Sequence, residues 1–543
     1  MVFARRSTTL LAAIIASCAM VLSLTACTSD NKTVVDGQTT VTSNSAGGVA
    51  VFTPSDGITL NQQTPLNKWA KLVPDLAKAL ADAGFKKGDI DHTTSDSLAK
   101  QSRAIQDFVV DHLSNNTTDD SGIAIAPDNM TLLVAPVVEA DASTRQYGDY
   151  VSQNLSTNDA TDGEATSDGE SSEDDSSKDD SSNTESDSTA SDEQAQAVDR
   201  LVSSLKLAKE SGMHVVLLGN SIEGYKPDAF VKFSDAQTIG KLQAEKMVSK
   251  LKLDKASKDN PKYIEVLLPY TAVDEKGNAN DSTFAQEAFR GIWQVLGSYY
   301  QKGVVESPSG TLDGKSTEND WQAVAYDAAK EGSTAKVLDK RLAKTDGQST
   351  LTRIDGIITM NDYIASEVVK ELDDLGYTGS AADINPQLTI SGIVGNITGK
   401  KDLSRDAVPD PIKSPENDNA NDSSSSDDDA DEDTSASDKD RDSQWPLVTG
   451  YGAYVSNIPS IVNGKQWMTG MEDRQTIATD IAQACAKLNK DEALNSMPSI
   501  RNSEVGGVKK IPTISEPLLA VSASNLKSAL IDPGYISLAD AGL

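Results

Sequence analysis

Apolar residues recur along this chain at two spacings that alternate with one another. Apolar positions near a 3.6-residue period predict amphipathic helices at 66–84, 97–113, 238–252, 282–301, 320–333 and 364–376. Short runs rich in apolar and β-branched residues predict buried strands at 131–138, 262–269, 353–360 and 446–452, and a helix followed by a strand at 197–220. This alternation predicts parallel sheets with helices on both faces.

The length of the patterned sequence predicts two such units rather than one. About 430 of the 543 residues carry helix or strand patterns, which is more than one ordinary domain holds. The predicted fold class is therefore α/β, with two Rossmann-like, doubly wound domains. Open α/β sheets bind ligands beyond the carboxyl ends of their strands, so two facing domains form a cleft that can close on a small molecule.

Two acidic tracts interrupt this pattern. The formal net charge is −33, and residues 158–194 hold 14 acids and one lysine. Residues 416–442 hold 12 acids, one lysine and one arginine, so the two tracts together carry −23. Both are rich in Ser and Asp and lack aromatic residues, which predicts disordered insertions at 158–194 and 413–443. Calcium binding is the competing interpretation, but neither tract has the ligand spacing of an EF-hand loop.

The first 27 residues have the three parts of a secretory signal. Arg5 and Arg6 precede an apolar run over 10–24, which is shorter than the roughly 20 residues of a membrane-spanning helix. The sequence Leu-Thr-Ala-Cys that ends at Cys27 resembles the bacterial lipobox, in which the cysteine thiol takes a diacylglyceryl group. We expect a signal peptide at 1–26, lipidation of Cys27, a tether at 27–56, and a place on the extracytoplasmic face of the cell membrane.

Several stretches in the remainder together resemble the type I periplasmic sugar-binding proteins, in particular the xylose-binding and multiple-sugar-binding branch. In chain order they include "KWAKLVPDLAKALADAGF", "LAKESGMHVVLLGNSI", "VKFSDAQTIGKLQAEKMV", "FAQEAFRGIWQVL", "IDGIITMNDYIASEVVKELDDLGYTG" and "NGKQWMTGMEDRQTIATDIAQACAKL". The resemblance covers nearly all of 57–543 outside the acidic tracts, and it lies in the order and spacing of the pieces.

This resemblance implies a domain organisation and a role. It implies a first domain over 57–233 with 472–492, and a second over 234–470 with the tail 520–543, joined by a hinge of three segments. Members of the family deliver sugars to an ABC permease, so the implied partners are a sugar-like ligand, the permease subunits in the membrane and, through Cys27, the membrane itself. A monomer without a cofactor or metal is expected.

The same resemblance implies a set of ligand-binding residues. Asn361 and Asp362 match the family's Asn-Asp pair at a strand end, although both are also favoured helix N-caps. The other candidates, for which packing roles remain open, are Trp69, Trp321, Tyr451, Asn220 and Phe284.

The chain departs from the family at several of these positions. Gly219-Asn220 stands where the family has Asp-Arg, and Gly450-Tyr451-Gly452 stands where it has Gly-Gln-Asp. The loss of charged ligand groups implies an unusual ligand held by more aromatic surface, or a degenerate protein that acts as a ligand sensor or surface interaction protein. The family's ligand-turn strand matches either 388–402 or 446–470.

Other function classes lack their signatures. The chain has no Gly-x-Ser-x-Gly elbow, no Walker loop and no Gly-x-Gly-x-x-Gly, and its three histidines are scattered. We therefore expect no enzyme activity. The secretion signal and the missing N-terminal helix-turn-helix exclude the DNA-binding relatives of the family.

Overall fold

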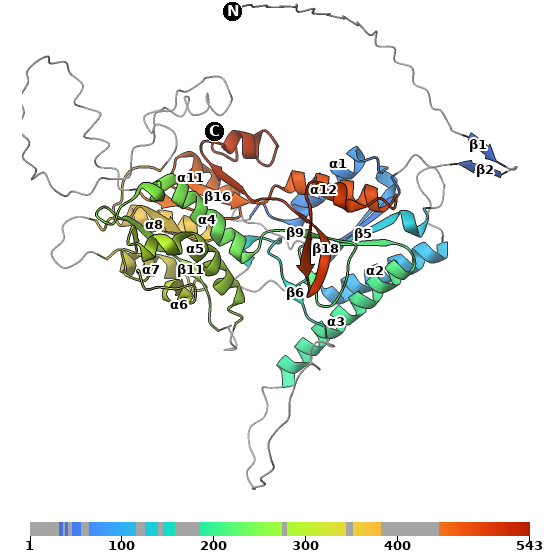
Figure 1. The fold of residues 1–543 in the computed structure, drawn as a ribbon, viewed down its shortest axis with the longest axis horizontal. Helices are drawn as coiled ribbons and strands as arrows, with labels where there is room; N and C mark the ends of the chain where they lie inside the picture. The colour runs from blue at the N-terminus through green and yellow to red at the C-terminus, as the bar shows by residue number, and fades with distance from the viewer. Residues whose placement is uncertain are drawn as a thin grey trace, which may run out of the picture. The chain divides into compact units, whose positions relative to one another are not determined.

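The structure, a computed structural model, describes residues 32–35, 38–41, 46–55, 65–115, 125–138, 145–157, 185–273, 280–343, 351–381 and 445–543. The chain divides into two units, Met1–Asn44 and Ser45–Leu543. In the first unit, β1 (Lys32–Val35) pairs antiparallel with β2 (Gln38–Val41). The second unit holds two α/β lobes, each built around its own sheet (Figure 1).

A seven-stranded, mostly parallel sheet organises the first lobe. Its strand order is β17-β18-β9-β7-β5-β3-β4, and only the β17–β18 pair is antiparallel. The strands are β3 (Gly48–Pro54), β4 (Ile90–Ser95), β5 (Met130–Val134), β7 (His214–Leu218), β9 (Ala229–Lys232), β17 (Ile500–Val505) and β18 (Val508–Ser515). A short parallel pair, β6 (Asn154–Leu155) with β8 (Ser221–Ile222), lies outside this sheet.

Helices cover both faces of the first-lobe sheet because its strands are apolar on both sides. Successive strand residues point to opposite faces, so Leu133 of β5 packs with one group of helices and Leu132 with the other. The first group is α1 (Trp69–Asp82) with α12 (Arg474–Leu488), and the second is α2 (Leu98–Asn115) with α3 (Glu185–Glu210). This is the doubly wound arrangement that the sequence predicts.

The second lobe repeats the α/β plan with a parallel sheet in the order β12-β10-β14-β15. Its strands are β10 (Lys262–Val266), β12 (Val305–Glu306), β14 (Gly356–Ile358) and β15 (Leu447–Val448), beside a parallel pair of β11 (Leu268–Pro269) with β13 (Ala325–Tyr326). Its helices are α4 (Ala236–Leu251), α5 (Thr283–Gln301), α6 (Trp321–Val324), α7 (Ser333–Arg341), α8 (Asp362–Asp374) and α11 (Ile458–Val462).

Three chain segments pass between the lobes. They connect β9 to α4, β16 (Met468–Met471) to α12, and β18 to β19 (Leu519–Ser522). β16 and β19 pair antiparallel and pack with the C-terminal residues, which include a short helix at Lys527–Ile531. The fold class is therefore α/β, with two Rossmann-like lobes and a three-segment hinge.

The predicted tether at 27–56 is wrong at its C-terminal end. Residues Gly48–Pro54 form β3, which pairs with β4 on one side and β5 on the other. The sequence "GVAVFTP" is apolar and β-branched, and its first six residues are buried. The Thr, Ser and Gly residues before it obscured this strand.

The predicted helix at 320–333 is also wrong over most of its length. Only Trp321–Val324 is helical, and Ala325 and Tyr326 form β13. Pairing with β11 provides backbone hydrogen-bond partners that override the helical spacing of the apolar residues.

The C-terminal boundary of the predicted disordered insertion at 158–194 is wrong. α3 begins at Glu185, so residues 185–194 are helical, and the preceding residues from 158 lie outside the described part of the chain. The second predicted insertion, 413–443, lies wholly outside the described residues.

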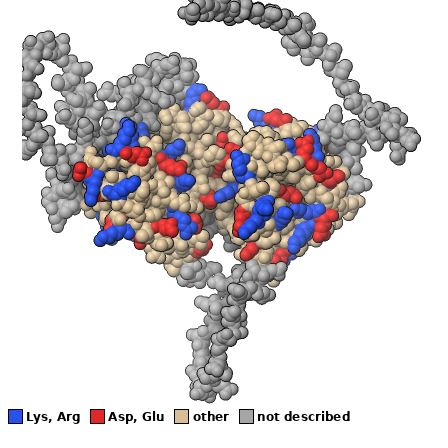
Figure 2. All heavy atoms as spheres, in the orientation of Figure 1, with Lys and Arg blue, Asp and Glu red and all other residues tan. Residues whose placement is uncertain are grey.

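The surface of the described residues carries charges of both signs. Lys and Arg alternate with Asp and Glu over both lobes on the face in Figure 2, without a large patch of one sign. No helix among the described residues is long and apolar enough to cross a membrane.

Candidate functional site

Asn361 lies three residues after the end of β14, at the carboxyl end of the second-lobe sheet. Its side-chain oxygen accepts a hydrogen bond from the Ile364 N–H at 2.9 Å, so it caps α8. Its amide nitrogen donates to the side-chain oxygen of Gln146 at 3.0 Å. The capping interpretation is therefore confirmed for Asn361 but not for Asp362, which is the first residue of α8. The amide nitrogen of Asn361 interacts with another part of the chain.

Asp362 is buried and fully engaged by groups of the second lobe. Its carboxylate accepts hydrogen bonds from the Tyr454 N–H at 2.9 Å, the Gln466 amide at 2.7 Å and the Thr469 hydroxyl at 2.9 Å. Burial raises the pKa of Asp362 to about 6, against the lowering effect of these donors. A Cβ at Gly450 would lie 2.1 Å from the carboxylate, so glycine is required there. These contacts give Asp362 a structural role.

Tyr451 and Glu472 join two of the hinge segments. The Tyr451 hydroxyl bonds to the Ser234 hydroxyl and donates to the Glu472 carboxylate at 3.4 Å. Glu472 also accepts the Ser234 N–H at 2.6 Å. Burial raises the pKa of Glu472 to about 7, although these hydrogen bonds favour the charged form.

Glu472 is therefore expected to make stability depend on pH. Its pKa is about 7 in the folded chain, against about 4.5 for an ordinary glutamate side chain. The contribution of Glu472 to the free energy of unfolding is thus complete below pH about 4.5 and is lost as the pH rises through about 7. A Glu472→Gln variant should be more stable than the wild type at pH 8 by about 1–3 kcal/mol and nearly equal at pH 4.5.

Urea unfolding at pH 4.5, 6 and 8 measures this difference. Asp362→Asn is the comparison, because that pKa is raised only to about 6 and its effect should end at lower pH. An unchanged stability profile for Glu472→Gln would show that Glu472 does not titrate in this range.

The first-lobe candidates Trp69 and Asn220 face inward. Trp69 is 2% exposed, and its ring packs edge-on against Tyr150 at 5.1 Å between centroids. Asn220 donates to the Pro136 carbonyl at 2.9 Å and accepts the Gln153 N–H at 3.0 Å. Neither side chain is exposed to solvent.

The second-lobe candidates Phe284 and Tyr451 both lie close to the ring of Tyr147. The ring centroid of Tyr147 is 4.7 Å from that of Phe284 and 6.3 Å from that of Tyr451. The structure thus brings five of the seven predicted ligand residues together, but around residues 146–153 of the chain itself. These five are Asn361, Tyr451, Phe284, Trp69 and Asn220.

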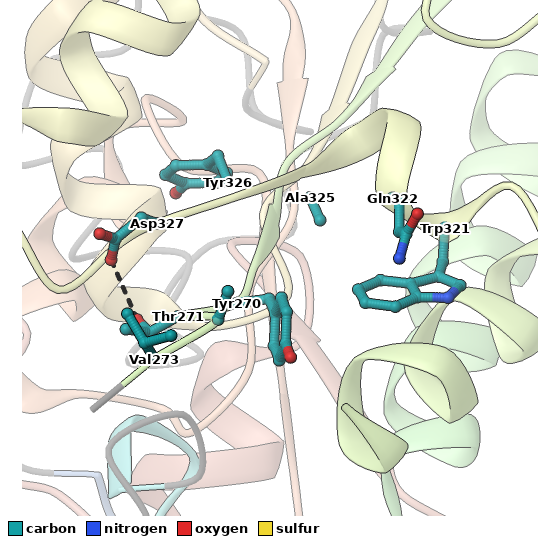
Figure 3. A pocket seen from close by; sticks show the side chains of 9 residues that line it. Tyr270, Thr271, Val273, Trp321, Gln322, Ala325, Tyr326 and Asp327 are labelled. Atoms are coloured by element: carbon teal, nitrogen blue, oxygen red, sulfur yellow. Dashed lines mark hydrogen bonds between the residues drawn. The ribbon is translucent and has the colours of Figure 1, made fainter. Parts of the chain in front are cut away.

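Trp321 is separate from this group and lines a cavity of about 300 Å³ in the second lobe. The cavity lies at the carboxyl ends of the paired strands β11 and β13 (Figure 3). Trp321 meets Tyr270 edge-on, with ring centroids 5.1 Å apart and planes at 82°. The remaining lining residues are Thr271, Ala272, Val273, Gln322, Ala325, Tyr326 and Asp327.

A carboxylate stands at the other end of this cavity. Asp327 accepts the Thr271 hydroxyl at 3.0 Å, the dashed line in Figure 3, and pairs with Lys330 at 3.0 Å. Partial burial acts to raise the pKa of Asp327, but hydrogen bonds from Lys330, Ala329 and Thr271 outweigh it and lower the pKa. The carboxylate is therefore ionised at neutral pH and accepts hydrogen bonds.

Sequence reasoning missed Tyr270, Thr271 and Asp327. A usable signal was present, because Tyr270 and Thr271 directly follow the buried run that ends at Pro269, at a strand's carboxyl end. Asp327 was missed because the sequence predicted a helix over 320–333, whereas in the structure it directly follows the strand β13. Within the described ranges, no three or more His, Cys, Asp or Glu side chains lie together as metal ligands would.

Comparisons with known proteins give structural similarity at low sequence identity. No protein-family model matches the chain, and no curated protein matches it. One similar structure is an ABC transporter solute-binding protein from Clostridium phytofermentans with bound β-D-glucose, at 16% identity and a TM-score of 0.44. It covers 91% of this chain and 99% of its own.

Two further structures are similar over comparable lengths. A carbohydrate transporter solute-binding protein from Chloroflexus aurantiacus, in complex with D-glucose, has 18% identity and a TM-score of 0.43, and covers 92% of this chain and 98% of its own. A periplasmic solute-binding protein from Actinobacillus succinogenes with bound D-allose has 11% identity and a TM-score of 0.38, with coverages of 89% and 99%.

Proposed function

We propose that this protein is an extracytoplasmic solute-binding protein that captures a sugar-like ligand and delivers it to an ABC permease. The supporting observation is the second-lobe cavity, which combines Trp321, Tyr270 and the ionised Asp327 at the carboxyl ends of two parallel strands. Its volume of about 300 Å³ is at the small end of the range for ligand pockets. This size suits a single sugar ring.

The chemistry of the cavity suits a sugar at both ends. The C–H face of a sugar ring is apolar and packs on an aromatic surface such as the Trp321 indole. Its hydroxyl groups donate to the Asp327 carboxylate and accept from the Gln322 amide. A fixed aromatic face opposite a carboxylate therefore selects a polyhydroxylated ring over a purely apolar molecule.

Replacing Trp321 by alanine is expected to weaken binding of such a ligand tenfold or more. The first step is a calorimetric and thermal-shift screen of the wild type against mono- and oligosaccharides, in which a ligand at 100 times its Kd stabilises the fold by about 2.7 kcal/mol. The hit is then titrated into Trp321→Ala, which removes the ring that packs on the sugar.

Trp445→Ala is the matched control for this experiment. Trp445 belongs to the core of the same lobe and is 8% exposed, as is Trp321, but it does not line the cavity. Equal weakening in both variants would assign the effect to loss of packing in the lobe. If no saccharide raises the melting temperature of the wild type, the sugar-binding proposal fails.

We also place the protein at the cell membrane, held by acyl chains on Cys27. This part of the proposal rests on the sequence around Cys27, which lies outside the described residues. A lipid tether would keep the protein beside the permease and prevent it from diffusing away from the cell.

A second candidate function is that of a ligand sensor or surface interaction protein without transport. The observation that favours it is the occupation of Asn361, Tyr451 and Phe284 by the chain's own residues. A sugar that binds while transport in a permease assay is absent would support this candidate over the first.

A further inference from the structure

Residues 146–153, here called the interlobe insert, belong to the connection between β5 and α3 of the first lobe but reach into the second. The Gln146 side-chain oxygen accepts from the Asn361 amide at 3.0 Å, and the Gln146 carbonyl accepts from the Tyr454 hydroxyl at 2.6 Å. Both partners lie at the carboxyl end of the second-lobe sheet. The insert therefore satisfies polar groups at the edge where an open α/β sheet binds ligands.

The centre of the insert is an aromatic ring enclosed by the second lobe. Tyr147 has no exposed surface and packs with the second-lobe core, as does Val151. Its ring lies against Phe284 and Tyr451, from α5 and from the turn after β15. The Tyr147 side chain, from a connection of the first lobe, is thus packed among residues of the second lobe.

The other side of the insert is fixed to the first lobe. The Asp149 carboxylate accepts from the Lys68 ammonium at 2.7 Å and from the Trp69 N–H at 3.1 Å. The Tyr150 hydroxyl donates to the Lys68 carbonyl at 2.6 Å, and its ring stacks with Phe233 at 4.7 Å. Anchors to the two lobes thus occur within a few consecutive residues.

Gly148 allows this two-sided contact. Its φ of +93° is in the region that favours glycine, and a Cβ there would lie 2.5 Å from the Asn67 carbonyl oxygen. A side chain at this position would push the insert away from the first lobe. The close approach is therefore specific to glycine.

We propose that the interlobe insert is a built-in ligand, which contacts both lobes at once and holds them closed without a diffusible molecule. It supplies contacts that a polar ring-shaped ligand makes. The Tyr147 ring packs against two aromatic side chains. The Gln146 carboxamide and carbonyl oxygens accept hydrogen bonds from an amide and a phenol. The lobes then separate only when the insert leaves. The proposal stands whether or not the cavity at Trp321 binds a sugar.

Pulsed electron–electron distance measurements between the lobes test this proposal. Spin labels are placed by Asp111→Cys on α2 and Lys336→Cys on α7, in the full chain carrying Cys18→Ser and Cys27→Ser, because Cys485 is buried. The unliganded protein with the native insert should give one narrow distance distribution. Tyr147→Ala and, independently, Gly148→Val should broaden it and raise the open population about tenfold or more.

The control is Tyr377→Ala. Tyr377 is a buried tyrosine of the second-lobe core whose hydroxyl donates to the Thr352 carbonyl at 2.6 Å within the same lobe. It should leave the distribution narrow. The proposal is overturned if the protein with the native insert already samples open and closed states without a ligand. It is equally overturned if either insert variant folds, by circular dichroism, and stays closed.

Discussion

Replacing Arg341 by methionine is expected to lower the free energy of unfolding by about 3–5 kcal/mol. Arg341 ends α7, and its guanidinium is nearly buried beside the Glu265 carboxylate, 3.4 Å away, whose side chain has no exposed surface. Removing the cation leaves a buried carboxylate without its counter-charge. The remaining partners of Glu265, the Ser307 hydroxyl and the Ser309 N–H, do not replace that charge.

The same guanidinium also supports the cavity at Trp321. It donates to the Val266 carbonyl at 2.5 Å and to the Val324 carbonyl at 2.9 Å, directly before the segments that carry β11 and β13. Arg341 therefore holds together the two strands whose ends supply Tyr270 and Asp327. We expect the methionine variant to lose ligand affinity together with stability.

Denaturant unfolding of the variant measures the loss, with Lys340→Met as the control. Lys340 neighbours Arg341 on α7 but is exposed, so its replacement should change stability by less than about 0.5 kcal/mol. Replacing both partners, as Arg341→Met with Glu265→Leu, should recover much of the loss because no unpaired charge remains. A loss below 1 kcal/mol in Arg341→Met alone would contradict this account.

Helices with a clear apolar face were predictable from sequence to within a few residues. α5, predicted at 282–301, spans Thr283–Gln301, and α8, predicted at 364–376, spans Asp362–Asp374. Both bury one stripe against a sheet, so local periodicity and tertiary packing favour the same structure. The burial of Cys485 in α12 follows from the same pattern.

Elements whose structure depends on distant partners were not predictable in this way. The hairpin of β17 and β18 turns at Gly506 and Gly507, both with positive φ, and joins the first sheet through β9, which is more than 270 residues earlier. β13 has only two residues and exists because β11 lies beside it. Local composition carries little information about pairing over such separations.

The strand-end position of Asn361 was predictable from sequence, but its hydrogen-bond partner was not. Asn361 was expected at a strand end, and it does follow β14. That it bonds to Gln146 depends on a contact between residues 215 positions apart, next to an acidic tract that conceals the insert. Phe284 and Tyr451 were expected to provide aromatic surface for a ligand, and in the structure the ring of Tyr147 packs against both.

Replacing Cys27 by alanine is expected to abolish acylation and normal membrane retention. The thiol is the group to which a diacylglyceryl chain would be joined, and alanine offers no nucleophile there. Each buried CH₂ contributes about 0.8 kcal/mol, so one acyl chain binds marginally whereas two or more anchor stably. Without the thiol, the protein should be released or remain with its signal segment uncleaved.

Metabolic labelling with an alkyne fatty acid, followed by membrane fractionation and intact mass, separates these outcomes. Cys485→Ala is the matched control, because Cys485 is buried in α12 and should leave labelling unchanged. Mass distinguishes an unprocessed chain, which keeps residues 1–26, from a cleaved and released one. Fatty-acid labelling that persists in Cys27→Ala, or its absence from the wild type, would overturn the anchor and leave the receptor without its expected tether beside the permease.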